Sequence, residues 1–171
     1  GVAESGHPAV GELGEAVGSP DSGGRKKASA VLGLRGDERA VTAVRAALDD
    51  GDPEVRLKAV WALGRIKGER AMSSLREAMA NAHSDVRHKA ASTLESQGWK
   101  PAKGREEAVY LIASKKWPKL AELGRAAEEP LAAMAGDDDP QVREEVKWLL
   151  DEIKSASELD ELLGSLKKDQ Q

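Results

Sequence analysis

The feature that most constrains this chain is a repeat with a period of 31 residues. The sequence DERAV at 37–41 recurs as GERAM at 68–72, and VR at 55–56 recurs at 86–87. Such repetition is typical of arrays in which each unit is one supersecondary element that buries its apolar face against its neighbours. Three units follow one another without a gap, at about 6–36, 37–67 and 68–98.

A fourth unit follows after an insertion. The VR pair of 86–87 reappears at 142–143, so the fourth unit spans about 125–155. Residues 99–124 then form an insert, which we expect to be helical. An amphipathic segment at 157–168 is expected to be a separate helix that caps the array. We therefore predict a single repeat array over 1–171.

Each unit is predicted to contain two helices. In the second unit, apolar residues at helical spacing predict a first helix over about 38–48. A second helix is predicted over about 53–66, because Asp52 is a good N-cap and Pro53 is tolerated at the first helical position. The fourth unit repeats this pair as Asp139 and Pro140. The predicted fold class is all-α: an α-α superhelix, or solenoid of helical hairpins.

The repeated motif also indicates a family. The sequence DPEVR at 52–56, followed by Ala59, ALG at 62–64 and Ile66, resembles the short HEAT-like repeat of phycobilin-lyase-like proteins. The resemblance covers most of 6–155. In that family, residues at the aspartate and arginine positions form a ladder that joins neighbouring repeats. The resemblance implies this structural role for Asp21, Arg25, Asp52, Arg56, Arg87, Asp139 and Arg143.

Composition and motif spacing argue against catalysis. The chain has no cysteine, so disulfides and thiolate metal sites are excluded. Its three histidines form no His-Glu pair of the kind that binds iron in deoxyhypusine hydroxylase, a HEAT-like enzyme. The aspartates at 137–139 lack EF-hand spacing, and neither a phosphate-binding loop nor a nucleophile–base pair occurs. We therefore expect no catalytic residue, no metal and no cofactor, and we expect that the protein is not an enzyme.

Charge and hydropathy restrict the partners. The net charge of −4 gives no general attraction to nucleic acid or to anionic membranes. No run approaches the ~20 apolar residues that a membrane span needs. We expect a cytoplasmic monomer that binds an unidentified protein or peptide, with no nucleic acid and no membrane. Because the chain starts with Gly1 instead of Met, we also expect its natural N-terminus to be missing or processed.

The tryptophans are the strongest indication of a binding site. At about 100° per residue, Trp61 lies off the apolar stripe of its helix, and Trp148 has the matching place in the fourth unit. Second helices usually line the concave side, so we expect both indoles to face one groove, with Lys26 and Lys27 nearby. The alternative is that either indole packs between helices. The predicted groove comprises Leu57, Lys58, Trp61, Arg65, His88, Lys89, Ser92, Glu144, Glu145 and Trp148.

Three functions compete at this point. The predicted one is a non-catalytic protein–protein interaction scaffold that binds its partner in the concave groove, since exposed aromatics near arginine are typical of binding hot spots. An accessory factor or lyase-like subunit of bilin or cofactor attachment is implied by the resemblance alone. A HEAT-like DNA-binding or repair protein, such as an alkylpurine glycosylase, needs a broadly basic groove, and the acidic fourth unit argues against it.

Overall fold

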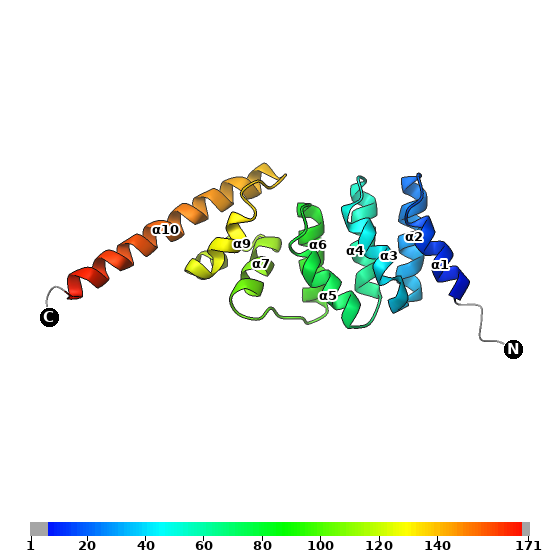
Figure 1. The fold of residues 1–171 in the computed structure, drawn as a ribbon, viewed down its shortest axis with the longest axis horizontal. Helices are drawn as coiled ribbons and strands as arrows, with labels where there is room; N and C mark the ends of the chain where they lie inside the picture. Colours follow the sequence, from blue (N-terminus) through cyan, green and yellow to red (C-terminus); the bar gives the residue numbers. More distant parts are fainter. Residues whose placement is uncertain (1–6, 169–171) are drawn as a thin grey trace. The chain divides into compact units, whose positions relative to one another are not determined.

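The computed structural model describes residues 7–168, and within that range the chain forms helices and turns with no strand (Figure 1). The predicted class, an all-α solenoid, is confirmed. The chain divides into two compact units, one ending at Lys100 and the other beginning at Pro101.

The first unit is a stack of three helical hairpins. The second helices of the hairpins, α2, α4 and α6, lie side by side in chain order (Figure 1). The hairpins are α1 (His7–Ala16) with α2 (Ser22–Arg35); η1 (Glu38–Ala40), α3 (Val41–Ala46) and η2 (Ala47–Asp49) with α4 (Pro53–Arg65); and α5 (Glu69–Ala78) with α6 (Ser84–Ser96). The second helix of the second repeat ends one residue earlier than predicted, and the predicted first helix consists of a short α-helix between two 3-10 turns.

The repeat period is visible in the core of this stack. Leu32, Leu63 and Leu94 lie one period apart, and all three are completely buried. Ala59 and Ala90 are buried in the same way one turn earlier in their helices. Equivalent residues therefore point inward in every hairpin, and neighbouring hairpins share one apolar layer.

Two glycines, also one period apart, allow the second helices to approach closely. A Cβ atom on Gly33 would lie 2.7 Å from the Cα atom of Ala62 in the next hairpin. A Cβ atom on Gly64 would lie 2.6 Å from Cγ2 of Thr93. A larger residue at Gly33 would therefore push α2 from the backbone of α4, whereas at Gly64 it would have to displace the methyl group of Thr93.

The turn between the two helices is built in the same way in all four repeats. An arginine in the second helix donates from its guanidinium to the carbonyl oxygen six residues earlier in the turn. The pairs are Arg25 with Ser19, Arg56 with Asp50, Arg87 with Asn81, and Arg143 with Asp137, at 2.9, 2.9, 2.8 and 2.5 Å. The shared hydrogen bond shows that the fourth repeat, although it lies beyond the insert, retains the turn of the first three.

Arg25 and Arg56 also join neighbouring repeats. Arg25 binds the carboxylate of Asp50 with an Nε–Oδ2 distance of 2.6 Å, and this bond lowers the pKa of Asp50. Arg56 binds Asp85, with an Nη2–Oδ2 distance of 2.8 Å. The carboxylates that these arginines bind, Asp50 and Asp85, are therefore not the aspartates that the family resemblance places in the ladder.

The aspartates of the implied ladder cap helices instead. The side chains of Asp21, Asp52 and Asp139 accept backbone N–H groups at the first turns of α2, α4 and α10 (Pro140–Lys168). Their carboxylate oxygens satisfy N-terminal amides of their own helices, and Asp139 also pairs with Lys115.

The second unit holds the insert and the fourth repeat. The insert contains α7 (Arg105–Ala113) and α8 (Trp117–Ala121), and the 3-10 turn η3 (Gly124–Ala127) begins the fourth repeat. The fourth repeat contains α9 (Glu128–Ala132) and α10 (Pro140–Lys168). One core cluster joins the two parts: Ala108, Leu111, Ile112, Leu120, Ala127, Leu131, Val142, Val146, Leu149 and Ile153.

The prediction of a separate capping helix at 157–168 was wrong. Helix α10 continues without a break for 29 residues, from Pro140 to Lys168. The sequence KSAS at 154–157 contains neither glycine nor proline, so nothing ends the helix where the repeat ends. The leucines of this segment are exposed, so they do not cover an apolar layer as a cap would.

The close approach at Gly33 can be tested by adding one methyl group. We expect Gly33→Ala to lower the free energy of unfolding by roughly 1–3 kcal/mol, because the methyl group meets the backbone of α4. Gly11→Ala is the control: it lies in α1 with no atom within 4 Å of its Cβ position, and it should stabilise by about 0.5–1 kcal/mol. Urea unfolding measures both, and a stabilising Gly33→Ala would contradict the close packing.

The recurring arginine can be tested in the same way. Arg56→Ala removes the bond to the Asp50 carbonyl and the ion pair with Asp85. It should cost roughly 1.5–3 kcal/mol of unfolding free energy, because these are charge-assisted bonds of a largely buried side chain. Arg45→Ala breaks an exposed pair with Glu77 and should cost about 0–1 kcal/mol. Equal effects of the two substitutions would show that the turn does not depend on Arg56.

Candidate functional site

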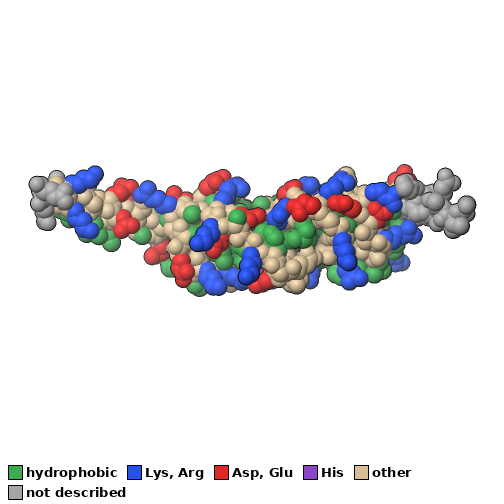
Figure 2. All heavy atoms as spheres, turned by 90° about the horizontal axis from the view of Figure 1, so that it is seen from below, with side chains coloured by type: hydrophobic (Ala, Val, Ile, Leu, Met, Phe, Trp, Pro, Cys, Tyr) green, Lys and Arg blue, Asp and Glu red, His purple; other side chains and the backbone are tan. Residues whose placement is uncertain are grey.

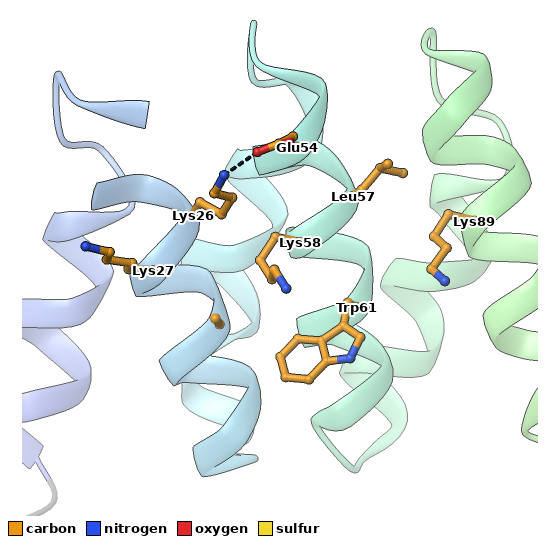
Figure 3. A pocket seen from close by; sticks show the side chains of 8 residues that line it. Lys26, Lys27, Glu54, Leu57, Lys58, Trp61 and Lys89 are labelled. Atoms are coloured by element: carbon orange, nitrogen blue, oxygen red, sulfur yellow. Dashed lines mark hydrogen bonds and ion pairs between the residues drawn. The ribbon is translucent and has the colours of Figure 1, made fainter. Parts of the chain in front are cut away.

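A groove of about 670 Å³ lies on the surface of the first unit. It extends over the three second helices, α2, α4 and α6, and Figure 3 shows its side chains. We call it the lysine groove. Its lining residues are Lys26, Lys27, Ala30, Glu54, Leu57, Lys58, Trp61 and Lys89.

Helix α4 supplies half of this lining. Glu54, Leu57, Lys58 and Trp61 follow the spacing i, i+3, i+4, i+7, which places them on one face of the helix. The buried stripe of α4, which includes Val55 and Ala59, lies beside this face. The repeat therefore determines the position of the site. Once the apolar stripe of α4 faces the core, these four side chains lie on the surface beside the neighbouring helices.

Trp61 belongs both to the groove and to the packing of the helices. Its indole is half-buried and turned towards α2, where a Cβ atom on Gly33 would lie 3.0 Å from its Cζ3 atom (Figure 3). The Nζ atom of Lys58 lies 5.0 Å from the centre of the ring, within cation–π distance. Because Gly33 has no side chain, the ring can pack closely against α2, and it forms a fixed apolar surface there.

The charge of the groove is positive, with four lysines against one glutamate. Lys26 pairs with Glu54, as the dashed line in Figure 3 marks, and this hydrogen bond raises the pKa of Lys26. Among the described residues, no carboxylate makes an ion pair with Lys27, Lys58 or Lys89. Lys58 and Lys89 therefore hold ammonium groups near the apolar surface of Trp61 and Leu57 without a carboxylate partner, whereas the ammonium group of Lys27 points away from that surface (Figure 3).

Comparison with known families identifies the array. HEAT repeats match residues 10–95, just over half of the chain, and the match includes the whole lysine groove. The chain belongs to the HEAT-repeat family. HEAT repeats generally serve as protein-interaction scaffolds and are typically non-catalytic. None of the curated proteins compared with the chain matches it, and the nearer likeness to phycobilin-lyase-like proteins stays a prediction.

The HEAT array brings together part of the predicted site. Leu57, Lys58, Trp61 and Lys89 line the lysine groove, with Lys26 and Lys27 beside them. Arg65, His88 and Ser92 are exposed on α4 and α6 but do not line it. The sequence analysis missed Ala30 and Glu54. Both carried a signal, because Ala30 lies one period before Trp61, and Glu54 lies seven residues before Trp61 on the same face of α4.

The remaining predicted groove residues lie in the second unit of the array. Glu144, Glu145 and Trp148 are carried by α10, where the indole of Trp148 is 56% exposed. They do not line the lysine groove. That Trp61 and Trp148 share one groove therefore stays a prediction.

Between residues 7 and 168, no three side chains of His, Asp or Glu come together as a metal site. No helix in this part combines the length and the apolarity that a membrane crossing requires.

The double role of Trp61 predicts unequal effects of two tryptophan substitutions. Trp61→Ala should cost about 1–3 kcal/mol of unfolding free energy, less than a fully buried indole would, because the ring is half-buried against Gly33. Trp148→Ala, in a side chain that is 56% exposed, should stay within about 0.5 kcal/mol of the parent. Thermal unfolding followed by circular dichroism checks both, and a neutral Trp61→Ala would contradict the packing role.

Proposed function

We propose that this chain is a non-catalytic scaffold for protein–protein interaction, and that a segment of its partner lies in the lysine groove. The observation that supports the proposal is the combination of Trp61 and Leu57 with four surrounding lysines. Tryptophan is enriched among the residues that contribute most to binding energy at interfaces. An apolar surface with a polar rim is also the usual anatomy of an interface.

The chemistry of the groove favours a partner segment of one kind. An aliphatic or aromatic side chain placed against Trp61 and Leu57 would lose water from both surfaces and supply most of the affinity. Carboxylates on either side of it would meet Lys58 and Lys89, whose charges speed association and select against basic segments. The proposed ligand is therefore an acidic segment with an apolar anchor residue.

Nucleic acid is the competitor that the lysines themselves suggest. Duplex recognition needs a basic surface that follows several phosphates, since affinity depends on the number of neutralised charges. Figure 2 shows acidic and basic side chains side by side on the visible surface of each unit. Figure 3 shows Glu54 within the groove itself, next to Lys26. This mixture of charges favours an acidic protein segment over a polyanion.

Fluorescence anisotropy with short labelled peptides tests the proposal. A peptide with leucine and phenylalanine between glutamates should bind, whereas peptides with lysines for the glutamates, or serines for the apolar residues, should bind much more weakly. In Lys58→Glu/Lys89→Glu, affinity for the acidic peptide should fall roughly tenfold or more, because two attractive contacts become repulsive.

Lys67→Glu/Lys100→Glu is the matched control. It changes the net charge by the same amount at two exposed positions outside the groove. Its affinity should remain close to that of the parent. An equal loss in both variants would show that only total charge matters and would reject the groove. Tighter binding of duplex DNA than of any peptide would replace the proposed partner by nucleic acid.

A further inference from the structure

The C-terminal part of α10 carries an apolar stripe that nothing in its own unit covers. Leu159, Leu162, Leu163 and Leu166 are 57%, 63%, 47% and 59% exposed. Their spacing of three, one and three residues places them together along one face of the helix. Four adjacent exposed leucines form a contiguous apolar strip, which soluble proteins rarely leave open to water.

The stripe is exposed because the apolar residues of α10 lie on a different side of the helix after the repeat ends. The first half of α10 buries Val142, Val146, Leu149 and Ile153. At about 100° per residue, the leucine stripe lies roughly 120° around the helix from this buried face. The polar side of the segment meets η3 instead, where Arg125 donates to Ser157 Oγ and to Glu161 Oε1, both at 2.7 Å. The leucines therefore face away from the layer that the same helix covers upstream.

We propose that residues 157–168 of α10 pair with the same segment of a second copy of the chain, antiparallel, with the leucine stripes in contact. This replaces the monomer expected from the sequence. Each copy contributes only four leucines, so the association is weak and depends on concentration. The proposal is independent of the lysine groove, which lies in the other unit.

The order of the leucines fits an antiparallel pair. The stripe reads the same in both directions about the midpoint between Leu162 and Leu163. A two-fold axis at that midpoint places Leu159 of one copy against Leu166 of the other and brings the central leucines of both copies together. The same surface patch then serves on both sides, as a two-fold interface requires.

Charges beside the stripe favour the same orientation. Asp160 and Lys167 lie seven residues apart and therefore on the same flank, while Glu158 lies on the opposite flank. In an antiparallel pair, equal flanks meet, so Asp160 of each copy comes next to Lys167 of the other. In a parallel pair, opposite flanks meet, and Asp160 comes next to Glu158. The attraction occurs twice in the antiparallel pair and is replaced by repulsion in the parallel one.

The composition of the segment argues against a lipid surface as the occupant. Helices that lie in membrane interfaces usually carry many lysines and arginines on their polar face, which bind anionic headgroups. In residues 157–168, three acidic side chains precede two lysines. A second copy offers partners of opposite charge to both the acidic and the basic side chains, whereas an anionic membrane would attract only the two lysines.

Sedimentation equilibrium of the full chain tests the pairing. The mass should rise with concentration from 18.2 kDa towards twice that value. Leu162→Gln/Leu163→Gln should weaken association at least tenfold without loss of helix content, because both side chains are exposed in the single chain. Leu34→Gln, at a leucine of α2 that is 66% exposed, is the control and should associate like the parent. A parent that keeps the single-chain mass up to millimolar concentration, or a double variant that associates equally well, overturns the proposal.

A charge exchange tests the orientation. Asp160→Lys and Lys167→Asp should each weaken association roughly threefold or more, since each turns two attractive contacts per pair into repulsive ones. Asp160→Lys/Lys167→Asp restores opposite charges across an antiparallel interface and should recover the affinity of the parent. A double variant no tighter than the single ones would overturn the antiparallel arrangement.

Discussion

The interaction on which the structure depends is the hydrogen bond between a helix arginine and the carbonyl six residues earlier. It recurs at Arg25, Arg56, Arg87 and Arg143, and it fixes where the second helix begins relative to the turn before it. Once the start of the helix is fixed, the 3.6-residue period decides which side chains enter the shared apolar layer. The lysine groove follows from this register, because its α4 residues are those left beside the buried stripe.

The sequence predicted the repeats well because their signals are local and redundant. Asp52 and Pro53 mark the start of α4, and leucines one period apart mark the core, so the helix was predicted to within one residue. The Arg25–Asp50 and Arg56–Asp85 pairs were not predicted, because they depend on which oxygens the caps already use. The continuous α10 was missed for another reason: the repeat ends at about 155, but no residue there ends the helix.

The candidate site could be predicted only in part. Leu57, Lys58 and Trp61 follow from helical spacing, and Lys89 follows from the period. The role of Gly33 could not be anticipated, since the space under the indole depends on the distance between two helices that are far apart in sequence. The two surfaces of the chain also differ in kind. The lysine groove combines a fixed indole with positive charge, whereas the end of α10 offers four leucines with charges of both signs.

The groove is shared by three hairpins, and this links occupancy to folding. In a repeat array each hairpin contacts only its neighbours, so the first one can detach while the second and third stay folded. Detachment would remove Lys26, Lys27 and Ala30 and leave only part of the surface that a ligand contacts. A ligand that contacts all three helices binds only the complete stack. Its binding energy therefore stabilises the first hairpin against detachment. The occupied protein would unfold as one cooperative block, whereas the empty one can lose its first hairpin separately.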